Sequence, residues 1–302
     1  MFHSKERSLK NYWFIGDIHG EYRLLERLLD SVQRFRPDHI LFVGDYIDRG
    51  AHSKEVVDLI MQLGGEVTCL MGNHEMMMLN AIEDLGIGYN PIELWYYNGG
   101  EATLQSFGAT SFFNFRSALE PRYLEFFQSL KMSRVVEVGS RLKILGTHAG
   151  ISPAIPLDDQ LIMKDYHELN DYMLRNHVDP GESFLWIRDG YFNSPPARWN
   201  DYLVVHGHTP TLKLQRYASA NNRTEFLFLE NDLGIRKEKG TGRIISIDID
   251  SGSAISGRLS GVGFFLETTG GREEVRMRSL TVSSEDLIPR DLGVVPRKDS
   301  RS

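Results

Sequence analysis

A chain of 302 residues is long enough to bury a substantial core, and its 41% hydrophobic and 25% charged residues are typical of a globular protein. The 34 Lys and Arg residues are outnumbered by 41 Asp and Glu residues, and the net charge of −7 argues against binding to a nucleic-acid backbone. The single cysteine, Cys69, excludes an intramolecular disulfide and a thiolate-rich zinc site. Because no apolar run suits a secretory signal or a membrane span, we expect a cytoplasmic protein without a membrane partner.

The first half of the chain alternates short apolar runs with amphipathic segments, a pattern typical of layered α/β proteins. The apolar runs are rich in β-branched or aromatic residues and stop at a glycine, which predicts buried strands. Between them, apolar residues recur at helical spacing, which predicts helices that cover the sheet. The predicted strands are residues 12–15, 40–43 and 67–71, and the predicted helices are residues 24–32 and 53–64.

The second half of the chain adds strands with few long helices between them, which predicts a second sheet. Turn residues within residues 212–242 indicate an insertion that holds a hairpin around residues 226–229. The predicted strands are residues 134–138, 142–146, 202–206, 243–249 and 262–266, and helical spacing returns at residues 121–130 and 158–175.

The end of the chain differs in composition from the rest. Apolar periodicity fades after residue 270, and charges of both signs intermingle there. We therefore expect one domain over residues 1–270 and a mobile tail over residues 271–302. The chain shows no internal repeat that would indicate a solenoid or an array.

Five short polar blocks directly follow predicted strands. In open α/β sheets, the loops at the carboxyl ends of parallel strands share one edge of the sheet, and ligands bind there. We therefore expect the five blocks to meet in space. They are GDIHG at residues 16–20, GDYIDRG at residues 44–50, GNHE at residues 72–75, THAG at residues 147–150 and HGHTP at residues 206–210.

The pooled side chains of these blocks are typical of a metal site. Carboxylate, amide and imidazole ligands together suit manganese, iron or zinc rather than calcium. Two ions about 3.5–4 Å apart could share the two carboxylate oxygens of Asp45 and turn a bridging water into a hydroxide nucleophile. The predicted ligands are Asp17, His19 and Asp45 at the first ion, and Asp45, Asn73, His148 and His208 at the second.

Three further residues in the blocks suit phosphate chemistry. Arg49 can direct two N–H donors onto phosphate oxygens, as a lysine could not. His74 follows a predicted metal ligand and is a candidate general acid for the leaving oxygen, with Asp48 holding its ring. Loss of such an acid should reduce the rate by roughly 10²–10⁴, and by less when the leaving group needs no proton.

The ordered succession GDIHG, GDYIDRG, GNHE, HAG and GHT resembles the phosphoprotein phosphatase family of calcineurin-like metallophosphoesterases, in its bacterial serine/threonine protein phosphatase branch. Three such blocks in order within sixty residues rarely recur by chance. Residues 95–104, 184–188 and 247–252 are also similar to stretches of that branch, so the resemblance extends from Trp13 to Phe265.

The resemblance implies a four-layer α/β/β/α sandwich of two mixed sheets and a hydrolase that removes phosphate from serine or threonine. It implies two divalent ions of the manganese type, with iron or zinc as alternatives, and a phosphorylated protein or small phosphoester as substrate. It also implies that Arg188 is a second phosphate-binding arginine and that His208, not His206, is the metal ligand of the last block. The long insertion and the tail depart from the pattern of the branch and leave the substrate open.

Other functions remain to be weighed against this one. Relatives that hydrolyse symmetrical dinucleoside tetraphosphates share the scaffold, but the intact His19, Asp48 and Arg49 favour a phosphomonoesterase. A nuclease or phosphodiesterase is disfavoured because Pro210 stands where such relatives carry a second histidine. A non-catalytic phosphate-binding scaffold should have lost a ligand or the acid pair, and both are complete here.

Ordinary structural roles compete with the catalytic ones at a few positions. Asp48 could pair with Arg49 or a backbone amide, and Arg188 could form a surface ion pair. Trp95, with the two tyrosines after it, could line a substrate groove, although a core cluster is at least as good an interpretation.

Overall fold

The computed structural model describes most of the chain, and its strands form two six-stranded sheets. Within the described ranges, the longest helix has 12 residues, and none is both long and apolar enough to cross a bilayer. The described residues are 10–86, 89–140, 142–194, 202–217, 224–229, 232–269 and 272–295.

The first sheet joins a parallel half to an antiparallel half, in the order β12-β11-β10-β1-β2-β3. Strands β1, β2 and β3 are parallel, with Phe14 opposite Leu41 and Leu41 opposite Thr68. Strand β10 runs antiparallel to β1, with Val262 opposite Phe14. The bounds are β1 Lys10–Ile15, β2 His39–Phe42, β3 Glu66–Cys69, β10 Leu259–Thr269, β11 Arg272–Val282 and β12 Leu287–Val294.

The second sheet has the order β4-β5-β6-β9-β8-β7, with β5, β6 and β9 parallel to one another. The predicted hairpin in the insertion is confirmed as β7 and β8, which pair Leu227 with Ile235 and extend this sheet. Within the predicted insertion, residues 218–223 and 230–231 lie outside the described residues. The bounds are β4 Ser133–Val138, β5 Leu142–Thr147, β6 Tyr202–His206, β7 Thr224–Leu229, β8 Leu233–Glu238 and β9 Ile244–Asp248.

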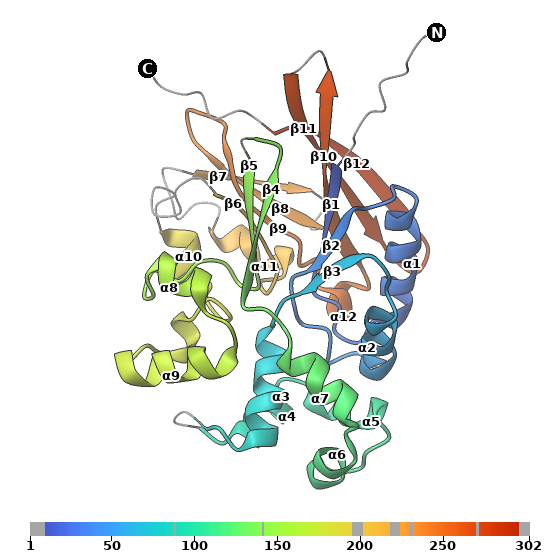
Figure 1. Cartoon of the computed structure of the whole chain (residues 1–302), viewed down its shortest axis with the longest axis vertical. Helices are drawn as coiled ribbons and strands as arrows, with labels where there is room; N and C mark the ends of the chain where they lie inside the picture. Colours follow the sequence, from blue (N-terminus) through green and yellow to red (C-terminus); the bar gives the residue numbers. More distant parts are fainter. Residues whose placement is uncertain are drawn as a thin grey trace.

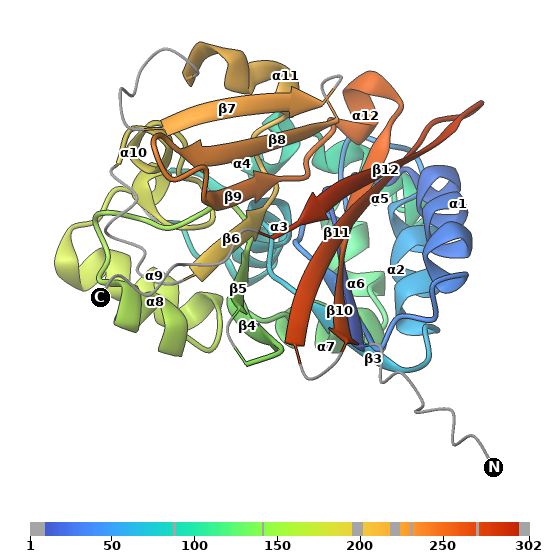
Figure 2. The same ribbon diagram turned by 90° about the horizontal axis from the view of Figure 1, so that it is seen from above.

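Helices flank the two sheets on their outer sides, as Figures 1 and 2 show for α1 and α2 on one side and α8 to α10 on the other. The longer helices are α1 Tyr22–Gln33, α2 Ser53–Met61, α3 Asn73–Glu83, α4 Pro91–Tyr97, α5 Gly100–Ser106, α6 Phe112–Ala118, α7 Pro121–Gln128, α8 Leu157–Ile162 and α9 Tyr166–Asn176. Short helices are α10 Asp189–Asn193, α11 Thr211–Leu214 and α12 Ser253–Ser256, with single turns at Pro180–Glu182 and Gln215–Tyr217.

Alternating side chains along the strands build three apolar layers, as the period of two in a strand requires. In β1, Trp13 and Ile15 face the helices that cover the first sheet, whereas Phe14 lies in the core between the two sheets. In β5, Ile144 belongs to the core between the sheets and Leu145 to the layer beneath α10 and α11. The molecule is therefore the four-layer α/β/β/α sandwich of two mixed sheets that the resemblance implies.

Two expectations about the end of the chain are wrong. Residues 272–282 and 287–294 form strands β11 and β12 of the first sheet rather than a mobile tail, with Met277 buried against the core between the sheets. Residues 262–266 belong to β10, which lies beside β1 and not in the second sheet. Pairing between segments about 250 positions apart leaves no local pattern in the sequence.

Candidate metal centre

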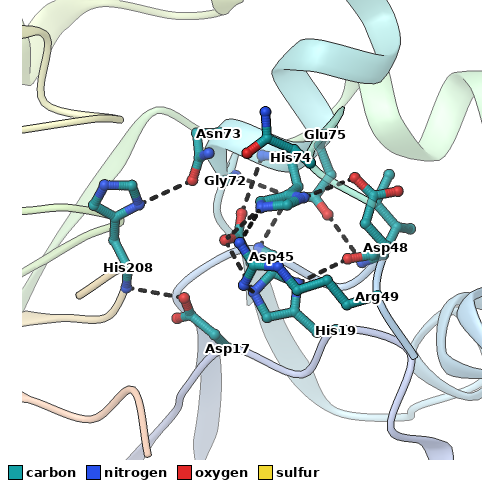
Figure 3. A network of polar contacts seen from close by, with 12 residues as sticks. Asp17, His19, Asp45, Asp48, Arg49, Gly72, Asn73, His74, Glu75 and His208 are labelled. Carbon is teal, nitrogen blue, oxygen red and sulfur yellow. Dashed lines mark hydrogen bonds and ion pairs between the residues drawn. The ribbon is translucent and has the colours of Figure 1, made fainter. Parts of the chain in front are cut away.

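Loops at the carboxyl ends of β1, β2, β3, β5 and β6 converge at one end of the sandwich, as the position of the blocks after the strands predicts. Figure 3 shows residues from four of the five loops. The backbone of these loops is strained, and strain of about 1–3 kcal/mol per residue concentrates at functional sites. Of the eight non-glycine residues with positive φ in the described part of the chain, five lie here: His19, Asp45, Asp48, Arg49 and His208.

Two glycines allow the loops to approach this closely. A Cβ atom at Gly72 would overlap the Asp45 carboxylate, and a Cβ atom at Gly207 would overlap the Asp17 carboxylate. The glycine after β3 and the glycine after β6 therefore give the two carboxylates their places.

The predicted ligands of the second ion lie together, with their acceptor atoms facing one another. The Asn73 side-chain oxygen lies 2.8 Å from His148 Nε2 and 2.9 Å from His208 Nδ1. Asp45 Oδ1 lies 3.4 Å from His148 Nε2. The ligand atoms of Asp45, His148 and His208 all lie within 4.8 Å of one another, in buried surroundings.

The tautomers of the two histidines follow from their outer hydrogen bonds. His148 Nδ1 lies 2.9 Å from the Val43 carbonyl oxygen, and His208 Nε2 lies 3.0 Å from the Trp186 carbonyl oxygen. A carbonyl can only accept, so each ring places an N–H there. Burial is the main cause that lowers the pKa of both rings. Each ring is therefore neutral and has a lone pair on the nitrogen that faces Asn73.

Two imidazole lone pairs, an amide oxygen and a carboxylate oxygen thus point at one place. Such a group of acceptors is unfavourable by itself and favourable around a cation. An outer N–H bond to a carbonyl is also the arrangement by which proteins orient a metal-binding histidine. The residues present therefore fit a divalent cation at this position, with nitrogen and oxygen ligands.

The predicted ligands of the first ion are less symmetrically arranged. His19 donates from Nδ1 to the Ile47 carbonyl at 3.0 Å, and its Nε2 lies 3.5 Å from Asp45 Oδ2. Asp17 accepts from the His208 backbone amide at 2.9 Å through Oδ2, whereas its buried Oδ1 has no hydrogen-bond partner among the described residues. Burial, followed by the charges of Asp250 and Asp45, raises the pKa of Asp17 well above its ordinary value. A second cation would satisfy this orphaned oxygen and offset the crowding of carboxylates.

The structure also places His74 beside this first set of ligands. Ligand atoms of His19, Asp45 and His74 lie within 4.8 Å of one another, and His74 Nε2 is 3.9 Å from Asp45 Oδ2. His74 Nδ1 lies 2.7 Å from Asp48 Oδ2, so Asp48 pairs with this ring rather than with Arg49. Both side chains are fully buried or nearly so.

Two arginines border the centre. The exposed Arg49 places Nη1 2.5 Å from His19 Nε2 and Nη2 2.8 Å from His74 Nε2. The half-buried Arg188 lies next to α10 and directs Nη2 toward the His208 carbonyl at 3.5 Å. Burial lowers the pKa of Arg188, and the negative charges of nearby groups, Asp45 among them, oppose that shift. Both guanidinium groups therefore lie where a phosphate at the metal centre could meet them.

His206 lies apart from this arrangement. Its ring is fully buried between Tyr191 and Phe192 and contacts the Gly207 carbonyl through Nδ1 at 3.1 Å. The structure thus brings His208, and not His206, to Asn73.

Sequence reasoning missed two buried carboxylates of the centre. Glu75 accepts the backbone amides of Asp45, Tyr46, Ile47 and Gly72 at 2.8–3.2 Å and so holds the loop after β2 against the start of α3. Its position three residues after Gly72, at a helix start, is a signal that could have found it. Asp250, after β9, has a pKa raised to about 6, chiefly by burial and also by Asp45.

Comparison with known protein families agrees with this geometry. The family model of the calcineurin-like phosphoesterases matches residues 10–235. The chain therefore belongs to the calcineurin-like phosphoesterase family, hydrolases whose members use divalent metal ions, and the clustered His and Asp ligands are in keeping with this.

Individual relatives point to two kinds of substrate. A symmetrical bis(5'-nucleosyl)-tetraphosphatase of Baumannia cicadellinicola is 32% identical over 221 residues, which are 71% of this chain and 67% of that protein. Serine/threonine-protein phosphatase 2 of Escherichia coli is 41% identical over 93 residues, which are 30% of this chain and 39% of that protein. A solved metallophosphoesterase structure from Sphaerobacter thermophilus aligns with 85% of this chain and 84% of its own, at 16% identity and a TM-score of 0.39.

Proposed function

We propose that this protein is a metal-dependent phosphomonoesterase that removes phosphate from serine or threonine side chains of phosphorylated proteins. The observation that carries the proposal is the buried pair of His74 and Asp48, joined at 2.7 Å. A serine or threonine alkoxide is a poor leaving group and needs a proton as the P–O bond breaks. A nucleotide leaving from a phosphoanhydride is already a good leaving group and gains little from an acid. A carefully held histidine is therefore most useful to a phosphomonoesterase.

Each residue of the centre has a part in the proposed reaction. We propose two manganese ions held by Asp17, His19, Asp45, Asn73, His148 and His208; when bound, they supply an acidified water and neutralise charge on the phosphoryl group. Arg49 and Arg188 bind and orient the phosphate oxygens through paired N–H donors. Asp48 accepts from His74 Nδ1 and fixes the orientation of the ring, with Nε2 as the atom that gives a proton to the leaving oxygen.

A second candidate is the hydrolysis of symmetrical dinucleoside tetraphosphates. It is favoured by the relatives that align over most of this chain, because several carry that activity in their names. The same metal ligands and arginines could serve this reaction. In that reaction, proton donation by the pair of His74 and Asp48 would contribute little.

The deciding experiment compares substrates on one preparation of the protein. After removal of bound metal, the protein receives manganese, iron or zinc and is assayed with a phosphoserine peptide, a phosphothreonine peptide and a symmetrical dinucleoside tetraphosphate. The proposal expects the phosphopeptides to have the higher kcat/KM. A clear preference for the tetraphosphate would contradict it and support the second candidate.

Two variants test whether the metal centre is the active site. Asp45→Asn should abolish turnover of every substrate, because one neutral amide oxygen cannot bridge two cations. Asp30→Asn, at an exposed position of α1, is the matched control and should leave turnover unchanged. Full activity of Asp45→Asn would refute the two-ion account of the reaction.

A further inference from the structure

The Asp48 carboxylate is held from three directions. Its side chain is completely buried, and Thr103 Oγ1 donates to Oδ1 at 2.6 Å. Trp95 Nε1 lies 3.0 Å from both Oδ1 and Oδ2. His74 Nδ1 takes the remaining position on Oδ2 at 2.7 Å. The carboxylate therefore has two fixed donors besides the histidine that it serves.

Both fixed donors come from one small unit, α4 and α5, which we call the α4–α5 brace (residues 91–106). Trp95 lies on α4 and Thr103 on α5, and both are completely buried. The Trp95 ring packs directly on Gly100, where any Cβ atom would meet it at 2.6 Å. The two donors thus come from one packed unit.

The α4–α5 brace also holds the backbone next to Asp48. Thr103 Oγ1 accepts the Asp48 backbone amide at 2.9 Å, and the Gly99 carbonyl accepts the Arg49 amide at 3.2 Å. Both Asp48 and Arg49 have positive φ, a conformation that non-glycine residues keep only when their surroundings impose it. The brace supplies that constraint at two consecutive residues.

We propose that Trp95 and Thr103 are positioning residues that act through Asp48, fixing its carboxylate so that one oxygen faces His74 during proton transfer. This inference rests on the proposed role of His74 as the acid. Without either donor, the buried charge of Asp48 would have fewer hydrogen bonds to offset the loss of water. The carboxylate could then rotate, and it would hold the His74 ring less firmly. Outer hydrogen-bond partners of metal-binding residues are commonly worth about 10- to 100-fold in metal affinity or activity, and we expect an effect of similar size on His74.

The test uses variants that keep most of the side chain and delete its polar group. Because Thr103 Oγ1 also accepts the Asp48 backbone amide, Trp95→Phe is the variant that removes a donor alone. Thr103→Val keeps the shape of the side chain and deletes the hydroxyl, and Thr103→Ser restores the hydroxyl. Trp95→Phe keeps an aromatic ring against Phe112 and Phe115 and deletes the N–H. Thr110→Val, at an exposed position where the hydroxyl contacts only Asn114 in the described structure, is the matched control.

The readout is the dependence of kcat on the leaving group, measured on the manganese-loaded protein. Phenyl phosphate has a poor leaving group that needs a proton, and 2,4-dinitrophenyl phosphate has a good one that does not. Thr103→Val and Trp95→Phe should lower kcat for phenyl phosphate by about 10- to 100-fold, with KM and the dinitrophenyl rate changed far less. Thr103→Ser should recover most of the loss, and Thr110→Val should behave as the unmodified protein.

The possible failures can be told apart with His74→Asn as a reference. If His74→Asn lowers kcat equally for phenyl phosphate and 2,4-dinitrophenyl phosphate, His74 is not the acid, and the inference fails with that proposal. The other outcome is that His74→Asn lowers kcat mainly for phenyl phosphate. If Thr103→Val and Trp95→Phe then lower kcat equally for the two aryl phosphates, or lower it for neither, the inference alone is overturned. Because aryl phosphates serve as probes, the outcome does not depend on which natural substrate the protein takes. Should Thr103→Val fail to fold, Trp95→Phe decides between the same outcomes.

Discussion

Replacement of Glu75 by glutamine tests how the loops of the centre are held in place. Glu75 Oε1 accepts the amides of Tyr46 and Ile47, and Oε2 accepts those of Asp45 and Gly72. Glutamine retains one oxygen and presents an NH₂ group in place of the other, so two buried backbone amides lose their acceptor. Each such loss costs about 1–3 kcal/mol, and Glu75→Gln should lower the free energy of unfolding by about 2–6 kcal/mol.

The assay is urea denaturation followed by circular dichroism, with the free energy extrapolated to zero urea. Glu66→Gln is the matched control, because the Glu66 side chain is 82% exposed and makes its one polar contact within the described ranges with His39. Its free energy of unfolding should stay within about 0.5 kcal/mol of the unmodified protein. A Glu75→Gln protein as stable as the control would refute the reasoning that this carboxylate holds the loops.

Two further predictions concern metal and pH. Manganese at one hundred times its dissociation constant should raise the free energy of unfolding by about 2.7 kcal/mol relative to protein kept in chelator, and an unchanged urea midpoint would contradict metal binding to the folded state. Burial lowers the pKa of His206 to about 4. Between a pH of about 6.5 and about 4, this histidine is therefore protonated in the unfolded chain and neutral in the folded protein. The free energy of unfolding should therefore decrease as the pH is lowered, by about 2 kcal/mol between pH 6.5 and pH 5 for this residue. In the presence of chelator, His206→Gln should make the free energy of unfolding less dependent on pH. An unaltered pH dependence would contradict the lowered pKa of the buried His206.

The meeting of the polar blocks could be predicted from the sequence because it follows from one geometric rule. Parallel strands end at a common edge, so polar blocks after successive strands must meet there. The structure brings Asp45, Asn73, His148 and His208 together on this basis, and it joins Asp17 to His208 across 191 positions of the chain. The choice between His206 and His208 depended on the resemblance, since His206 ends the same strand that His208 follows.

The supporting residues could not be predicted in the same way, because they act from segments without a polar block. Trp95 was expected in a core cluster or a groove, and it does pack against Phe115, yet its one polar atom contacts Asp48. Thr103 contributes a single hydroxyl from the buried side of a short helix, and such a position looks like packing in a sequence. Periodicity reports which side is buried, and it does not report what a buried polar atom contacts.

The error about the tail has a different physical cause. In β11, charged residues such as Arg276 and Arg278 alternate with Met277 and other inward-facing residues, which is the pattern of an antiparallel strand with one face outside the core. The density of charge hid that alternation. In β12, Pro289 is a residue that rarely occurs inside a sheet, although proline is tolerated at a sheet edge, where β12 lies.

The proposed reaction depends on two cations, one on either side of Asp45. Protein stripped with chelator and reloaded with excess manganese should bind two ions per chain by elemental analysis. Anomalous diffraction from crystals of the same sample should show two peaks about 3.5–4 Å apart, one toward His19 and the other toward His148. A single peak, or none, in protein that hydrolyses aryl phosphate would contradict the account.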